Sequence, residues 1–174
     1  MKSLLIAVAT VAAVVLAQSP PEPTPPAPTI APLPLSNNQT YWHNWADEHG
    51  VTHLTKCHFK NWSLVNLLPP SMPLYLDKFG PAANVQLANT PPGWKGPWHR
   101  DPVPQLVFFL TGKGFWRFDD GTTHVFHPGD IYFGNDQAAR KGHESYTHGN
   151  ETLILAMVQF PQWSTTMARP CWLE

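Results

Sequence analysis

Proline is the residue that most restricts the fold of this chain, because 20 of the 174 residues are prolines spread along most of its length. A proline inside a helix removes a backbone hydrogen bond and clashes with the preceding turn, so long helices are excluded over most of the sequence. Eight prolines fall within Ser19–Pro34. That density predicts an extended, semi-rigid spacer without a core, and the rest of the chain is expected to be rich in β-structure.

The segments after the spacer have the lengths and boundaries of short strands. Each is bounded by Gly, Pro or Asp-Gly turns, and Asp120-Gly121 is a strong hairpin signal. There is no helical period and no internal repeat, so the sequence predicts one all-β domain, a sandwich or barrel. Residues 42–50 could form a short helical turn or a loop. The predicted strands are residues 51–59, 84–89, 104–110, 114–118, 122–126, 130–134 and 152–160.

Residues 1–17 are expected to be a secretory signal peptide. Lys2 provides a positive n-region, residues 4–16 are apolar except for Thr10, and small residues precede Gln18. The apolar run is shorter than the roughly 20 residues that span a bilayer. The sequence therefore predicts a secreted protein with a Pro-rich linker over 18–35, a single domain over 36–174 and no membrane association after cleavage. An uncleaved anchor is the alternative.

Secretion predicts two kinds of covalent modification. Asn38, Asn61 and Asn150 each begin an Asn-x-Ser/Thr triplet without a central proline, so each is a candidate glycosylation site. Cys57 and Cys171 lie near the start and the end of the folded region and are expected to form a disulfide in an oxidising compartment. Two buried free thiols are the alternative, and no cysteine spacing indicates structural zinc.

The charge balance and the aromatic content exclude two classes of protein. Eleven Lys and Arg against 12 Asp and Glu give a formal net charge of −1, so no excess of positive charge is available for nucleic acid or for an anionic membrane surface. The 8 Trp, 4 Tyr and 9 Phe can form a large core. Disorder throughout the chain is therefore also excluded.

The most informative block of sequence runs from Gly93 to Gly112. Gly93 is followed by five residues and His99, one residue and Asp101, three residues and Gln105, and six residues and Gly112. This spacing resembles the first motif of the cupin superfamily, Gly-x5-His-x-His-x3,4-Glu-x6-Gly, at every marked position. Two residue types differ, because Asp101 replaces the second His and Gln105 replaces the Glu.

A second block resembles the second cupin motif less closely. Gly129 and His143 fit its two ends, but the interval is three residues longer than usual, and Thr147 stands where an Asn is expected. The resemblance is strongest over residues 93–160. It implies a single cupin-type β-barrel, also called a double-stranded β-helix or jelly roll, and a possible homodimer formed through barrel edges.

His99, Asp101, Gln105 and His143 are the candidate metal ligands. His99 and Asp101 have the same parity and could converge on one point. A neighbouring strand would add His143, giving a two-His-one-carboxylate set that suits Fe(II), with Gln105 as a neutral fourth ligand. The sequence does not distinguish Fe, Mn, Ni, Zn and Cu. The alternatives are packed or exposed histidines, a Gln105 amide hydrogen-bonded inside the barrel, and an Asp101 side chain turned to solvent.

The barrel interior could also hold a small-molecule substrate. In strand 104–110, Gln105, Val107 and Phe109 are expected to face inward and Leu106 outward. Arg140 and Lys141 could attract an anionic substrate, although solvation is their usual role. The candidate substrate-binding residues are Trp98, Phe109, Trp116 and Tyr132, and core packing is the alternative role for them.

Three functions remain open at this point. The first is a metal-dependent enzyme acting on a small organic molecule, with the ion as a Lewis acid or an oxygen-activating centre; a dioxygenase, isomerase, decarboxylase or lyase would fit equally. The second is a 2-oxoglutarate/Fe(II) oxygenase, which needs a cation after the last His, where the next Lys or Arg is Arg169. The third is a non-catalytic extracellular binding or structural cupin with a degenerate metal site, which the two substituted ligand positions and the Pro-rich spacer favour.

Overall fold

The computed structural model describes residues 39–67, 69–161, 169–171 and 173. The expected signal peptide, the linker over 18–35 and the candidate glycosylation site Asn38 lie outside these residues. All regular structure in the described residues is β-strand, as the prolines predict. This part of the chain contains no helix with the length and apolarity needed to cross a membrane.

The described residues form twelve strands, and seven of them correspond to the seven predicted segments. The other five were not predicted as strands; they are β1, β3, β4, β6 and β11. In chain order the strands are β1 Thr40–Ala46, β2 Thr52–His58, β3 Ser63–Val65, β4 Leu74–Leu76, β5 Asn84–Thr90, β6 Lys95–His99, β7 Gln105–Thr111, β8 Gly114–Phe118, β9 Thr123–Phe126, β10 Ile131–Asn135, β11 His143–Thr147 and β12 Leu153–Gln159.

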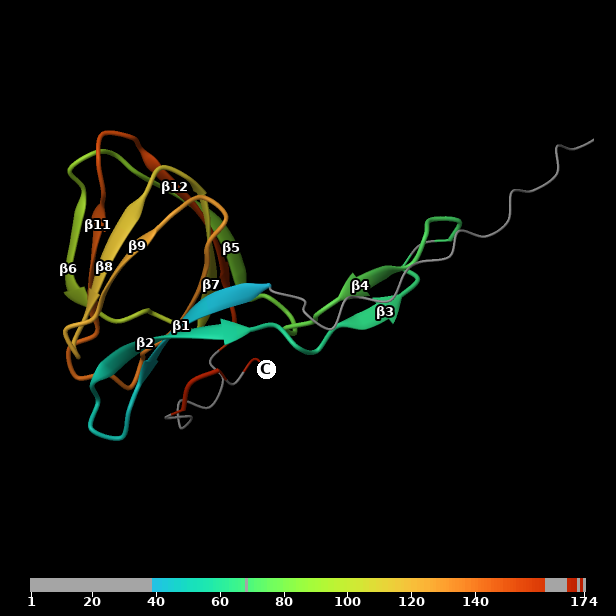
Figure 1. Cartoon of the computed structure of the whole chain (residues 1–174), viewed down its shortest axis with the longest axis horizontal. Coiled ribbons are helices and arrows are strands. Elements are labelled where there is room, and N and C mark those ends of the chain that lie inside the picture. The colour runs from blue at the N-terminus through green and yellow to red at the C-terminus, as the bar shows by residue number, and fades with distance from the viewer. Residues whose placement is uncertain (1–38, 68, 162–168, 172, 174) are drawn as a thin grey trace, which may run out of the picture. The chain divides into compact units, whose positions relative to one another are not determined.

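Two sheets face each other. The six-stranded sheet has the order β2-β1-β10-β7-β12-β5, and the four-stranded sheet has the order β6-β11-β8-β9. Figure 1 shows β6, β11, β8 and β9 on one side of the barrel and β7, β12 and β5 on the other. All neighbouring strands are antiparallel except β1 and β10, which are parallel. This arrangement is the predicted jelly roll, while β3 and β4 pair only with each other.

Alternate side chains of the facing strands form the core between the sheets. Phe109 stacks on Phe126, with ring centroids 4.6 Å apart and planes inclined by 7°. Val107 and Phe109 belong to this core, which confirms the predicted inward face of β7. The buried members of the core are Val107, Phe109, Trp116, Phe118, Phe126, Tyr132, Leu153 and Leu155.

A second apolar cluster lies on the opposite face of the six-stranded sheet; we call it the outer cluster. Leu106, whose parity is opposite to that of Val107, belongs to it, as predicted. The predicted disulfide between Cys57 and Cys171 is confirmed, with a Cα–Cα distance of 5.3 Å, and it attaches the end of the chain to β2. The buried members are Tyr41, Cys57, Phe59, Leu106, Phe133, Phe160 and Leu173.

The prediction of a helical turn or loop over residues 42–50 is wrong for its first half. Residues 40–46 form β1, which pairs with β2 along its length and with β10 through residues 42–45. His43 and Asn44 are both fully buried although they point to opposite faces of the strand. Because these buried residues are polar, the apolar alternation that identifies a strand is hidden here.

His43 is expected to make stability depend on pH. Burial lowers the pKa of its imidazole to about 3, and its Nδ1 accepts a hydrogen bond from the Cys171 N–H (3.0 Å), which requires the neutral ring. In the unfolded chain the pKa returns to near 6.5, so between pH 6.5 and 3 only the unfolded state binds this proton. The stability due to neutral His43 is present above pH 6.5 and is lost as the pH falls toward 3.

Urea titrations at pH 7 and pH 4.5 measure this effect. His43 should contribute a decrease of about 2–3 kcal/mol in the free energy of unfolding at the lower pH. His43→Gln should reduce the pH dependence, and His49→Gln should not, because the His49 side chain is 74% exposed. An unchanged pH dependence in His43→Gln would contradict the explanation.

Candidate functional site

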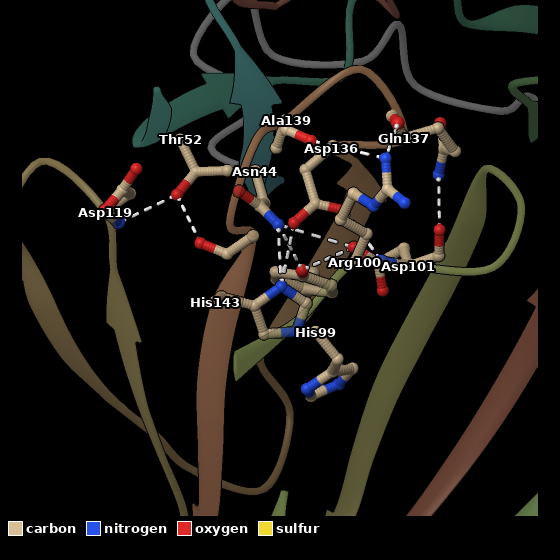
Figure 2. Close-up of polar contacts among 12 residues, drawn as sticks. Asn44, Thr52, His99, Arg100, Asp101, Asp119, Asp136, Gln137, Ala139 and His143 are labelled. Carbon is tan, nitrogen blue, oxygen red and sulfur yellow. Dashed lines mark hydrogen bonds and ion pairs between the residues drawn. The ribbon is translucent and has the colours of Figure 1, made fainter. Parts of the chain in front are cut away.

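His99 and His143 lie side by side because their strands pair. β6 and β11 are antiparallel neighbours whose register places His143 opposite His99. The two ring centroids are 4.5 Å apart, and Figure 2 shows the rings next to each other. The structure therefore brings together two predicted ligand residues that are distant in the sequence.

Gly142 determines how the chain enters β11. Its φ is +88°, a value that glycine adopts readily, and a side chain here would collide with the His99 carbonyl. The Gly142 carbonyl accepts a hydrogen bond from Thr52 Oγ1 (2.6 Å), and Thr52 Oγ1 accepts one from the Asp119 N–H (2.8 Å; Figure 2). These contacts fix the backbone immediately before His143.

Each of the two imidazoles has its Nδ1 held by an acceptor. His99 Nδ1 donates to the Pro97 carbonyl (2.6 Å), and His143 Nδ1 donates to Asp136 Oδ2 (2.9 Å). Carbonyl and carboxylate oxygens can only accept, so the proton of each neutral ring is on Nδ1 and the lone pair is on Nε2. Neither Nε2 is hydrogen-bonded to a described residue. Metal-binding histidines usually have this arrangement.

Asp101 is buried just beyond the end of β6, with 4% of its surface exposed. Its Oδ1 accepts a hydrogen bond from Gln105 Nε2 (2.7 Å), and its Oδ2 accepts one from Tyr132 Oη (2.8 Å) and one from Asn44 Nδ2 (3.3 Å). The carboxylate occupies space that a side chain at Gly134 would fill. Asp101 thus points into the barrel, and the alternative of a solvent-facing side chain is excluded.

Gln105 is also buried and uses both ends of its amide. Nε2 donates to Asp101, and Oε1 accepts a hydrogen bond from Gln159 Nε2 (3.0 Å). The sequence analysis gave such hydrogen bonds inside the barrel as the alternative to metal binding by Gln105. They give Gln105 a defined role in orienting the Asp101 carboxylate.

Asp136 is a site residue that sequence reasoning missed. It is fully buried; its Oδ1 accepts a hydrogen bond from the Asp101 N–H (2.7 Å) while its Oδ2 binds His143 (Figure 2). Asp101, Asp136 and His143 form a group that could hold a metal ion, because one ligand atom from each lies within 4.8 Å of the others. His99 is not a member of this group. The only sequence signal for Asp136 is an acidic residue at the end of a strand.

The charges of these groups are coupled. Burial raises the pKa of Asp101 to about 7, and the nearby charge of Asp136 acts in the same direction. Burial disfavours charged His143, but the carboxylates of Asp101 and Asp136 outweigh it and raise the pKa of His143. Burial likewise opposes ionisation of Asp136, but the hydrogen bond and charge of His143 outweigh it and lower the Asp136 pKa. Burial and the charge of His143 lower the pKa of His99, which favours its neutral, ligating form.

An interior cavity of about 200 Å³ opens beside these residues. Trp116 and Tyr132, two of the predicted substrate-binding residues, line it. Phe109 packs in the adjacent core, and Trp98 is not among the cavity residues. Instead, Lys141 Nζ lies 3.5 Å from the centroid of the Trp98 ring. The polar part of the lining is formed by His99, Asp101, Gln105 and His143. The rest of the lining is mainly apolar and consists of Ala88, Thr90, Trp94, Val107, Trp116, Tyr132, Ser145, Leu153, Leu155 and Met157.

The two facing sheets form a jelly-roll barrel, and a cluster of polar side chains in its interior forms the candidate site. Residues 86–158 match the family model described as the cupin domain. These residues therefore form a cupin domain, as the motif spacing predicts. The matched segment includes His99, Asp101, Gln105 and His143 but not β1, which contains Asn44.

Similar solved structures come from several bacteria. A conserved protein of unknown function from Streptococcus pyogenes is 19% identical with a TM-score of 0.36; the match covers 45% of this chain and 65% of that protein, slightly under two thirds of its length. A predicted oxalate decarboxylase from Thermotoga maritima is 16% identical with a TM-score of 0.34, covering 74% of this chain and 100% of that one. No curated protein matches the chain.

Proposed function

We propose that this protein is a metal-dependent cupin that acts on a small organic molecule in the interior cavity. The observation that supports it best is the pair of hydrogen bonds at Nδ1 of His99 and His143, which leave both Nε2 atoms available beside the cavity. A divalent transition metal would be bound by these two nitrogens and by the Asp101 carboxylate.

The residue types of this donor set fit such an ion, and His99 would have to move closer to Asp101 and His143 to complete it. Two imidazoles and one carboxylate are the ligands of mononuclear sites that keep open positions for substrate, and a carboxylate has lone pairs left after accepting three hydrogen bonds. Asp136 would orient His143 rather than ligate, because Asp136 is not among the residues that line the interior cavity and its Oδ2 binds Nδ1 of His143.

Each polar residue of the site then has a defined task. When bound, the metal supplies a Lewis acid or an oxygen-activating centre. Asn44, Gln105 and Tyr132 hold the Asp101 carboxylate in place through their hydrogen bonds. The apolar side chains Val107, Leu155 and Met157 exclude water from the part of the cavity where the substrate would lie.

Elemental analysis of protein purified without chelators tests the proposal. We expect a stoichiometric transition metal in the wild type and its loss in His99→Ala and in His143→Ala. His148→Ala is the matched control, because His148 is exposed after the end of β11, and it should keep its metal. A folded, metal-free wild type, or metal retained after both site substitutions together, would refute the metal centre and favour a non-catalytic binding cupin.

We also propose that the mature protein is extracellular and glycosylated. The Cys57–Cys171 disulfide supports an oxidising compartment, and the candidate glycosylation sites Asn61 and Asn150 are both exposed. N-terminal sequencing and glycosidase treatment of the protein from the culture medium of a eukaryotic host would test this. An uncleaved N-terminus would contradict it.

A further inference from the structure

A second hollow lies next to the candidate metal site; we call it the outer pocket. It has a volume of about 570 Å³, and its lining includes Arg100, Gln137, Arg140 and Lys141. His99 and Asp101 border both the outer pocket and the interior cavity. A molecule in the outer pocket would therefore be adjacent to the proposed metal ligands.

The two arginines of the outer pocket are positioned by backbone contacts that do not neutralise their charges. Arg100 Nη1 donates to the carbonyls of Gln137 (3.3 Å) and Ala139 (3.4 Å), which orient the guanidinium group but do not cancel its charge (Figure 2). The backbone of Arg140 is fixed by its N–H, which donates to the Gly50 carbonyl (2.8 Å). Within the described residues, neither arginine forms an ion pair.

The carboxylates near the outer pocket already have partners other than Arg100 and Arg140. Asp119 pairs with Lys141 at 3.4 Å, and Lys141 also lies over the Trp98 ring. The Asp101 carboxylate receives its hydrogen bonds from Gln105, Tyr132 and Asn44, all inside the barrel. Arg100 and Arg140 therefore remain as two uncompensated guanidinium groups in a chain whose net charge is −1.

A guanidinium group binds a carboxylate through two parallel hydrogen bonds, and two such groups at one hollow attract organic anions. The adjoining cavity is lined mainly by apolar side chains, among them Val107, Leu153 and Leu155. We propose that Arg100 and Arg140 bind the carboxylate of the substrate, whose apolar remainder enters the interior cavity. The substrate class is thus a small organic acid, and this inference rests on the proposed function for the chemistry that follows binding.

Calorimetric titration of the full, metal-containing chain with hexanoate tests the inference, with hexanamide as the neutral counterpart. Hexanoate is expected to bind roughly tenfold or more tightly than hexanamide, and less tightly as salt is added. Arg100→Gln and Arg140→Gln should each weaken hexanoate binding by about tenfold or more. Lys113→Gln is the matched control, since it removes one exposed positive charge before β8, outside the lining of either pocket.

Four results would overturn this assignment. They are no binding of hexanoate, equal binding of hexanamide, wild-type affinity in both arginine variants, and tighter binding of inorganic phosphate than of hexanoate through the same arginines. Metal analysis of the same samples separates the two proposals. A metal-free wild type that binds hexanoate through Arg140 refutes only the metal centre, and a metal-containing wild type with unaffected arginine variants refutes only the anion site.

Discussion

Replacing both Cys57 and Cys171 by serine is expected to lower the free energy of unfolding by about 4–5 kcal/mol. The disulfide joins residues separated by 114 positions, so its loss greatly increases the conformational freedom of the unfolded chain. The substitution also releases the segment that contains Leu173, whose side chain is buried in the outer cluster. Urea titration of both proteins at pH 7 gives the difference directly.

Reduction provides the control for this experiment. Wild-type protein treated with a thiol reductant should lose about the same stability as the double variant, whereas the reductant should leave the double variant unchanged. A loss below about 1 kcal/mol would mean that the outer cluster alone holds the C-terminal segment in place.

Asp136→Asn is expected to weaken metal binding by about 10- to 100-fold without removing any proposed ligand. Asp136 accepts hydrogen bonds at both oxygens, from the Asp101 N–H and from His143 Nδ1. An asparagine can accept only one of them, because its NH₂ group would face the other donor. Either the His143 ring or the Asp101 backbone must then shift, so the ligands lose their alignment.

Competitive titration of chelator-treated protein with Zn²⁺ measures this change in affinity. Glu151→Gln, which removes an exposed carboxylate between β11 and β12, should bind Zn²⁺ like the wild type. Circular dichroism checks that Asp136→Asn is folded before its affinity is compared. Wild-type affinity in a folded Asp136→Asn protein would show that Asp136 does not orient the ligands.

The fold was largely predictable because short apolar segments are separated by turn residues. Seven strands follow directly from these segments and their Gly, Pro and Asp-Gly boundaries. β1 and β11 were missed because their buried faces contain polar side chains, such as Asn44 and His143, which conceal the period of two. β6 was missed because Gly96 and Pro97 lie in its centre.

The candidate site was predictable only where a motif marks it. The spacing identified His99 and His143, whose contact requires only that β6 and β11 pair. Asp136 and Asn44 belong to no motif, and their roles follow from tertiary contacts that local sequence does not encode. Trp98 lines the outer pocket and not the interior cavity, because it directly precedes His99 and adjacent residues of a strand point to opposite faces.

The position of Asn44 limits how far the domain can be shortened. β1 lies before the segment that matches the cupin family. Its Asn44 side chain nevertheless donates a hydrogen bond to the Asp101 carboxylate, and the strand itself pairs with β10. A fragment trimmed to residues 86–158 would expose an open sheet edge at β10 and would have one donor fewer at its central carboxylate. For protein engineering, the minimal transplantable unit therefore begins at or before Thr40.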